Sequence, residues 1–187
     1  MNLNTGNEVE DIPTAVDNAD PYDTLRVGTG TFDLPGDSGD HRTLDVEGLT
    51  LEGPNAGIAG DSNQRGTEAT INGPLMIGAD NVTVDGVEIN DDDANSGGPL
   101  PGPGALQFAM GSGYGDTADN ATVKNNVIIG GKNSNNTNAV LAFKAVDDVV
   151  VERNQFDEEN AAVEAIAFGG PVNAELTNNT DNTTGSL

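Results

Sequence analysis

Six short apolar segments recur along the chain, and they restrict its fold more than any other feature. Each has apolar residues at its first and third positions, the period-two pattern of a short β-strand. Within two or three residues of each comes Gly or Asn, which tolerates the left-handed backbone of a sharp turn. The segments are 25–27, 49–51, 82–84, 121–123, 149–151 and 174–176.

The spacing of these segments predicts a repeating architecture. From Val27 to Leu51 is 24 residues, and the next four intervals are 33, 39, 28 and 25 residues. A period near 24, with three strands and three turns in each repeat, suits one coil of a three-sided parallel β-helix. The longer intervals hold insertions, chiefly 54–67 and 91–104, which we expect on one face. Further strand-like segments lie at 75–77, 87–89, 106–108, 127–129, 140–143, 155–156 and 165–168.

The composition fits a narrow core. Hydrophobic residues make up 35% of the chain and aromatic residues 4%, and Trp is absent. Val, Ile, Leu and Ala would therefore fill the interior, with a stacked ladder of three phenylalanines at equivalent strand ends. Three asparagines recur after successive segments, and we expect their side chains to hydrogen-bond along the stack. These residues are Phe108, Phe143 and Phe168, and Asn126, Asn154 and Asn179.

The N-terminal segment has a different pattern. Apolar residues at 9, 12, 15, 16 and 19 follow helical spacing, and Pro13 lies where a first turn tolerates it. A short helix here would cover the open end of the stack. We therefore predict a helical cap over 1–22, a parallel β-helix over 23–180 and a tail over 181–187, all within a single domain.

These segments resemble a known superfamily. Residues 11–19 followed by 23–32 are similar to the entry of pectate-lyase-like β-helix proteins, and 49–53 and 80–86 resemble their standard coil. The resemblance implies an all-β, right-handed parallel β-helix of five to six coils with a short N-terminal capping helix. It does not imply one activity, because that superfamily holds lyases, hydrolases, esterases, epimerases, viral tailspikes and non-enzymatic surface proteins.

The charge of the chain excludes several partners. Seven Lys and Arg face 31 Asp and Glu, for a formal net charge of −24. Nucleic acid and anionic membranes are therefore not expected partners, and no apolar run is long enough for membrane insertion. Molar salt shortens the Debye length to about 3 Å and screens such self-repulsion, so the composition predicts a salt-adapted, halophilic surface. Intrinsic disorder is the alternative, and the strict apolar pattern argues against it.

Four residues are candidates for catalysis. Lys124 and Arg153 follow successive strand segments and are candidate bases or sugar-binding cations, although pairing with Glu152 and nearby acids is the favoured interpretation. Asp147 and Asp148 resemble the adjacent carboxylates of the family's hydrolases, but the His-Gly and Arg-x-Lys elements that accompany them there are missing. We expect this pair to be a solvated turn before the strand at 149–151.

Other residues are candidates for binding or modification. Asp91, Asp92 and Asp93 are candidate ligands for Ca²⁺, although a solvated acidic loop is the favoured interpretation and no cofactor is required. Tyr114 lies among glycines and is a candidate sugar contact. Asn135 is a candidate glycosylation site among five sequons, which begin at Asn81, Asn120, Asn135, Asn178 and Asn182.

Two functions from different classes follow. The first is a non-enzymatic structural or recognition module on a cell or virion surface of a halophile, with a surface glycan or protein receptor as partner. The alternative is a lyase or glycoside hydrolase for acidic polysaccharide, which three or more acids beside Lys124 or Arg153 on one sheet would support. No helical cap follows Leu176, so we expect the last coil to meet a neighbouring subunit or a continuation of the chain. No signal peptide is visible at Met1, and the expected location is extracellular, at a cell surface or on a virion.

Overall fold

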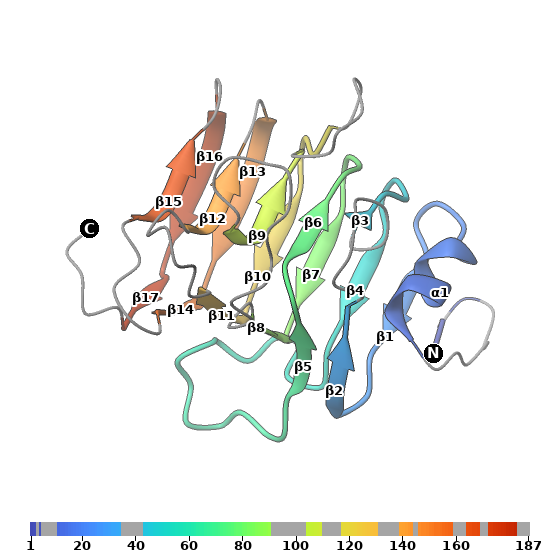
Figure 1. Ribbon diagram of the computed structural model, residues 1–187, viewed down its shortest axis with the longest axis horizontal. Helices are drawn as coiled ribbons and strands as arrows, with labels where there is room; N and C mark the ends of the chain where they lie inside the picture. The colour runs from blue at the N-terminus through green and yellow to red at the C-terminus, as the bar shows by residue number, and fades with distance from the viewer. Residues whose placement is uncertain are drawn as a thin grey trace.

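The protein is built mostly from parallel β-strands, with little helix (Figure 1). The computed structural model describes residues 1, 2, 4, 11–34, 43–90, 104–109, 117–130, 139–143, 146–158, 164–168 and 172–182. Over these residues, every pairing between named strands is parallel. The all-β, parallel class predicted from the sequence is confirmed.

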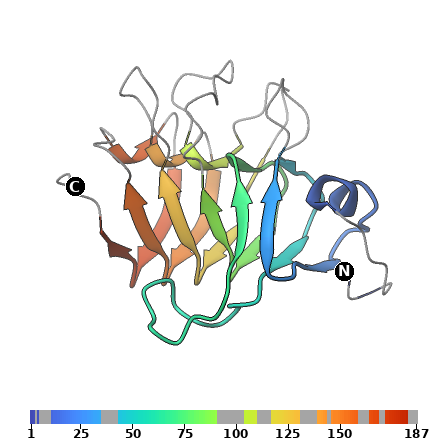
Figure 2. The ribbon, with the colours of Figure 1, turned by 60° about the horizontal axis from the view of Figure 1, so that its bottom comes forward.

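The strands form three sheets, and each sheet takes every third strand of the chain. Sheet A contains β1 (Thr24–Arg26), β4 (Thr50–Glu52), β7 (Thr83–Asp85), β10 (Thr122–Lys124), β13 (Val146–Glu152) and β16 (Val172–Thr177). Sheet B contains β2 (Gly30–Asp33), β5 (Ala69–Asn72), β8 (Glu88–Asn90), β11 (Val127–Gly130), β14 (Gln155–Glu158) and β17 (Thr180–Asp181). Sheet C contains β3 (Thr43–Leu44), β6 (Leu75–Ile77), β9 (Gly104–Phe108), β12 (Ala139–Phe143) and β15 (Glu164–Phe168). We call each set of consecutive strands, one from each sheet, a tier. The tiers follow one another along the long axis of the molecule (Figure 2).

The register keeps equivalent residues of successive tiers side by side. In sheet A the last residues of five predicted segments align as Leu51, Val84, Val123, Val151 and Leu176. The first segment is the exception, because Leu25 and not Val27 aligns with Leu51. The first interval is therefore the 26 residues from Leu25 to Leu51, and the 24-residue interval from Val27 to Leu51 was the wrong alignment.

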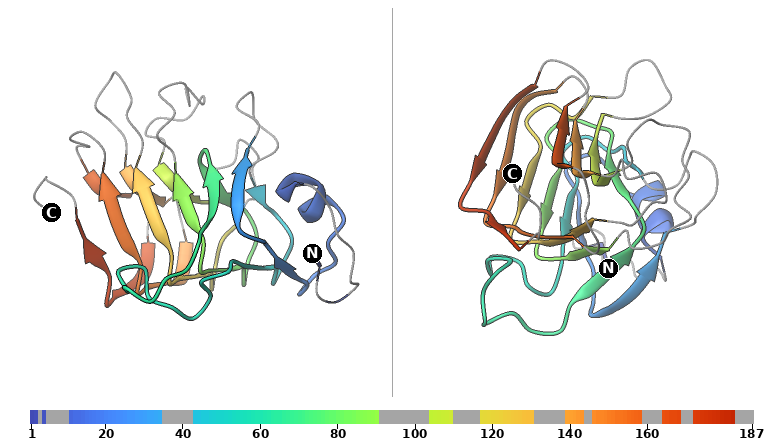
Figure 3. Two further views of the ribbon diagram at one scale, coloured as in Figure 1. Left: turned by 90° about the horizontal axis from the view of Figure 1, so that it is seen from below. Right: turned by 60° about the vertical axis from the view of Figure 1, so that its left-hand side comes forward.

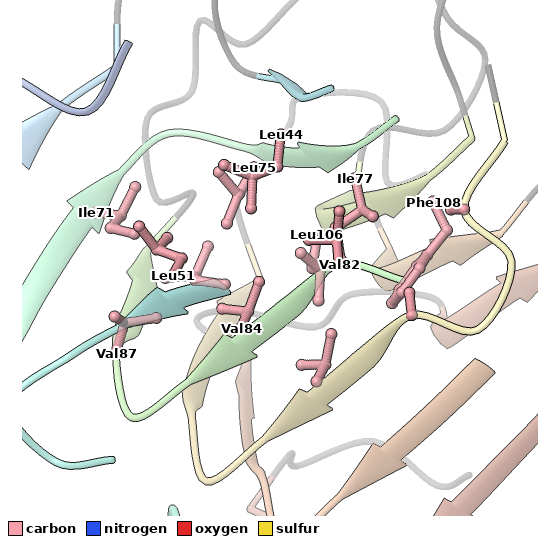
Figure 4. Packing of buried hydrophobic residues seen from close by; sticks show 14 of the residues in the cluster. Leu44, Leu51, Ile71, Leu75, Ile77, Val82, Val84, Val87, Leu106 and Phe108 are labelled. Carbon is pink, nitrogen blue, oxygen red and sulfur yellow. The ribbon is translucent and has the colours of Figure 1, made fainter. Parts of the chain in front are cut away.

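A continuous apolar core lies between the three sheets (Figure 4). Sheet A contributes Leu51 and Val84, and sheet C contributes Ile77 and Phe108, all fully buried. The backbone of Phe108 aligns with that of Phe143, which aligns with Phe168, so the predicted phenylalanine ladder is confirmed at the level of register. Most of the residues that fill this space are Val, Ile, Leu and Ala, in keeping with the low aromatic content.

The N-terminal end of the stack is covered. Helix α1 (Ile12–Asp17) begins at Asp11, whose carboxylate accepts the backbone N–H of Thr14 at 2.7 Å. Ile12 and Val16 are buried against the core. Asn2 forms an antiparallel bridge with Leu25, so that the first residues pair with the outer edge of β1. A helix and a bridge thus protect the edge that the first tier would otherwise expose.

The connection between β4 and β5 is the longest one that the structure describes. Residues 53–68, which we call the strap, run along the turns that join sheet A to sheet B (Figure 3). Gly57 N–H donates to Asp85, Gly60 N–H donates to the carbonyl of Arg153, and the Asp61 carboxylate accepts the hydroxyl of Thr180. The strap therefore reaches from the second tier to the last one. The predicted insertion at 54–67 corresponds to it.

Candidate functional site

The outer face of sheet A carries a row of charged residues along successive strands. Arg26, Glu52, Asp85, Lys124 and Glu152 occupy equivalent positions in the register. Arg26 Nη2 lies 2.8 Å from Glu52 Oε1, and Lys124 Nζ lies 3.7 Å from Asp85 Oδ2. Asp85 and Glu152 therefore flank Lys124 in this row, and Glu52 lies one strand beyond Asp85, so that two acids and not three lie directly beside Lys124.

The surroundings of Asp85 give this row a structural role. Its Oδ1 accepts the side-chain amide of Asn125 at 2.7 Å and the backbone N–H of Gly57 at 3.0 Å. With Lys124 at Oδ2, both carboxylate oxygens face donors within the protein. Asp85 thus fastens the strap to β7 and β10, and it is not a free acid or base.

Arg153 also contacts the strap. Its Nη2 donates to the carbonyl oxygen of Gly57 at 3.2 Å, and its own carbonyl accepts Gly60 N–H at 2.8 Å. Its backbone is left-handed, with φ of 57°. Lys124 ends β10, and Arg153 follows the end of the adjacent strand β13, one residue past the position that aligns with Lys124. In the described part of the chain, the salt bridge of Lys124 is with Asp85, and Arg153 forms none with Glu152.

Asp147 and Asp148 lie at the opposite end of β13. Both side chains are exposed, and both accept a hydrogen bond at 2.8 Å from the side-chain amide of Asn173. The pair lies inside β13, where the register shifts between Val146 and Val149, and not in a turn before the strand as expected. Asp147 is six residues from Arg153 along one strand, or roughly 20 Å at 3.3 Å per residue. The four catalytic candidates therefore do not converge on one site.

Acidic residues recur at the turns that lead into sheet A. Asp80 accepts the backbone N–H of Asp119 at 2.9 Å, and Asp119 accepts that of Asp147 at 2.8 Å. The residues that follow them, Asn81 and Asn120, are exposed and have left-handed backbones. We call the column that runs from Tyr22 past these residues to Asn173 the turn ridge. Its members are Tyr22, Glu47, Gly48, Asp80, Asn81, Asp119, Asn120, Asp147, Asp148 and Asn173.

Tyr22 begins the turn ridge and is the most exposed large hydrophobic residue among the described residues, at 62%. Its hydroxyl donates to Glu47 Oε1 at 2.6 Å, and this hydrogen bond together with the Glu47 charge raises the pKa of Tyr22. Its ring lies directly against Gly48, where a Cβ would overlap the ring. The ring is thus held in one orientation while most of its surface stays open to solvent.

The outer face of sheet C offers no charged groups in the described residues. Thr43, Met76, Gln107, Ala142 and Ala167 align there at the level of the backbone. In β9 the residues on both faces of the strand are buried, including Gln107, which is only 7% exposed, and Ala105, which is fully buried. This strand therefore does not line an open cleft, and the aligned row holds neither carboxylates nor cations for catalysis.

The predicted asparagine ladder is confirmed at the turns that join sheet A to sheet B. Asn126 Nδ2 donates to Asn154 Oδ1 at 3.1 Å, and Asn154 Nδ2 donates to Asn179 Oδ1 at 3.1 Å. Each side chain also donates to the carbonyl of a residue in the preceding tier, namely Val84, Val123 or Val151. These asparagines satisfy turn backbone that would otherwise be buried without partners.

Several sequence candidates lie outside the described residues. They are Tyr114, the acids Asp91, Asp92 and Asp93, and the sequon residue Asn135. Elsewhere, over the residues that the structure does describe, no group of three or more His, Asp or Glu is arranged to hold a metal ion. No helix among them is long and apolar enough to cross a membrane.

Comparison with known proteins leaves the site to be judged on its own geometry. No family model, no curated protein and no solved structure matches the chain. The residues that sequence reasoning missed are Tyr22 and Asp85. Tyr22 had one signal, because it lies just before a predicted strand at a turn. Asp85 had none, because its partners Gly57, Lys124 and Asn125 are distant in the sequence.

Proposed function

We propose that this protein is a non-enzymatic recognition module, built as a right-handed parallel β-helix and displayed on a cell or virion surface of a halophile. Attachment to a glycan or a protein receptor, or assembly with a neighbouring subunit, would be its role. The observation that carries the proposal is that the side chains of all four catalytic candidates already form hydrogen bonds or ion pairs within the protein. Lys124 pairs with Asp85, which accepts a hydrogen bond from the strap, and Arg153 donates to the strap directly. Asp147 and Asp148 bind Asn173 at the opposite end of β13.

The β-helix architecture is supported by the strand order. Every third strand joins the same sheet, the pairs are parallel, and an asparagine ladder links the turns. Connections between parallel strands are nearly always right-handed. The formal net charge of −24 supports the halophilic setting, because strong salt screens the self-repulsion of so many like charges.

One observation favours the enzymatic alternative, a lyase or hydrolase for acidic polysaccharide. Lys124 lies between Asp85 and Glu152 in the charged row, with Glu52 beyond Asp85. Its weakness is the set of hydrogen bonds that already occupies Asp85. A lysine base also needs to reach its substrate, and here the strap crosses next to it.

A screen in molar salt separates the two functions. The protein is incubated with neutral and uronate polysaccharides, and both binding and products are measured, as new reducing ends and as unsaturated uronates. The recognition module predicts binding without products. Products that disappear in Lys124→Met would establish the enzymatic alternative instead, with Arg26→Met as the matched loss of a cation from the same row.

A further inference from the structure

We propose that Tyr22 and the turn ridge form a binding site for an uncharged sugar chain, with a sugar ring stacked on Tyr22. The proposal rests on the recognition function and names its ligand class. It also replaces Tyr114 with Tyr22 as the aromatic contact. The argument starts from the way in which the ring is held.

The Tyr22 side chain is fixed before any ligand arrives. Its backbone has φ of 67°, a conformation that bulky residues rarely adopt. The hydroxyl is anchored by Glu47 at 2.6 Å, and the ring rests on Gly48. An exposed aromatic ring that has already lost its rotational freedom binds at a lower entropic cost.

The groups next to the ring match hydroxyls. Backbone hydrogen bonds order the turn ridge: Tyr22 N–H donates to the carbonyl of Glu47, Gly48 N–H to that of Asp80, and Asn81 N–H to that of Asp119. Tyr22, Gly48 and Asn81 therefore occupy successive positions in it. With the ring over Gly48, Asn81 is the next position, about 4.8 Å further along. Asn120 follows one spacing later. Both amides are exposed, and each can donate and accept, as sugar hydroxyls do.

The charge around the ring selects the class of sugar. Exposed carboxylates of Asp20, Asp45 and Glu47 lie in the segments beside Tyr22. A uronate would bring like charges together, which weakens binding. An amino sugar would suit the acids, but its ammonium group only donates hydrogen bonds, so it offers the amide donors of Asn81 and Asn120 fewer acceptors than a neutral sugar does. A neutral chain lying along the turn ridge uses both the ring and the amides.

The test uses the tyrosines themselves as reporters. The chain has two tyrosines and no Trp, so Tyr114→Phe leaves Tyr22 as the only fluorescent reporter. This protein is titrated in molar salt with neutral tetrasaccharides of glucose, mannose and galactose, and with tetragalacturonate and a glucosamine tetramer. We expect saturable changes in Tyr22 fluorescence with at least one neutral tetrasaccharide, and weaker binding of both charged ones.

Variants locate the site by calorimetry. Tyr22→Ala should weaken binding by about tenfold or more, and Tyr22→Phe, which keeps the ring, by much less. Asn81→Ala should weaken it severalfold, and Tyr114→Ala should leave it unchanged. Circular dichroism checks that each variant is folded.

The outcomes separate this site from the recognition function. Neutral sugars that bind equally to the wild type and Tyr22→Ala would overturn the site and leave the function standing. Preference for tetragalacturonate or the glucosamine tetramer would overturn the ligand class. The absence of binding to all five probes would overturn the site as well, whereas turnover of any probe would overturn the recognition function itself.

Discussion

Arg65 Nη1 donates a hydrogen bond to the carbonyl oxygen of Asn125, sixty residues further along the chain, at 2.6 Å. The same guanidinium forms a two-pronged pair with Glu68, at 2.7 and 2.9 Å. The Arg65 side chain is only 8% exposed. A buried cation thus joins the strap to the turn after β10 while its partner carboxylate stays within the strap.

Removal of Arg65 should loosen the strap. Arg65→Ala leaves Glu68 without its partner in a partly buried position, and we expect it to lower the free energy of unfolding by about 2–3 kcal/mol. Hydrogen exchange of residues 53–68 should accelerate, because their backbone would lose its anchor. Urea unfolding in molar salt measures the stability change.

The matched control for Arg65 is Arg26→Ala. Arg26 also pairs with a glutamate, but its side chain is half exposed, so its loss should cost under about 1 kcal/mol. Equal costs for the two variants would contradict the role given to the strap.

The asparagine ladder should be more sensitive than its polar character suggests. Asn154 is buried, donates to Val123 and Asn179, and accepts from both the backbone and the side chain of Asn126. Asn154→Ala leaves several buried groups without partners, and we expect a loss of about 2–4 kcal/mol. Asn182→Ala, at an exposed position, is the control and should change stability by less than about 0.5 kcal/mol.

Two glycines should respond in opposite ways to alanine. Gly86 has φ of 75°, and a Cβ there would overlap the backbone of Asn55 and Ala56 in the strap. Gly86→Ala should therefore cost about 2 kcal/mol or more. Gly28 has open space around it, so Gly28→Ala should be neutral or stabilising by up to about 1 kcal/mol. Thermal unfolding of the pair in one buffer measures the difference.

The stability of the N-terminal end should depend on acid pH through Asp23. Hydrogen bonds from the Asn2 amide, the Asp20 backbone and the Asn4 amide hold the pKa of Asp23 below its ordinary value. The charged form is therefore the stabilised one. Its contribution is complete above the unfolded-state pKa near 4 and is lost as the pH falls through the lower folded-state pKa.

This pH effect is measured by comparing the wild type with Asp23→Asn. The stability advantage of the wild type should be largest at about pH 7 and should shrink toward about pH 3. Asp17→Asn removes one exposed charge from α1 and controls for net charge. An advantage of the wild type that grows on acidification would show that the sign is wrong.

The periodic part of the fold could be predicted from the sequence because every tier places the same requirements on its residues. An inward residue such as Val84 or Val123 must be apolar, and a turn residue such as Asn126 must satisfy buried backbone. These requirements recur at every tier and leave a readable pattern. The segments in sheet A and the ladder asparagines were found in this way.

Other strands left a weaker pattern. Strand β2 has one inward residue, Phe32, between polar neighbours, and β3 has only Thr43 and Leu44. The displaced alignment of the first segment has a similar cause, because both Leu25 and Val27 are apolar and buried. Period-two patterning alone does not decide which of the two aligns with Leu51.

The contacts of the candidate site could not be predicted. Arg65 meets Asn125, Asp85 meets Gly57, and Tyr22 meets Glu47, each through a connection whose path local sequence does not encode. Asp80 and Asp119 were visible only as surface charge, whereas Asp147 was noticed only as part of a carboxylate pair. Their regular order arises from the register, which brings Asp80, Asp119 and Asp147 into one column.

The central claim is that this stack of parallel tiers recognises its ligand without transforming it. The most direct measurement is the chain length of the polysaccharide that it binds best, followed in molar salt during prolonged incubation with the protein. The recognition module predicts an unchanged chain length at full binding. A progressive shortening that follows the protein concentration and is lost in Lys124→Met would contradict the claim.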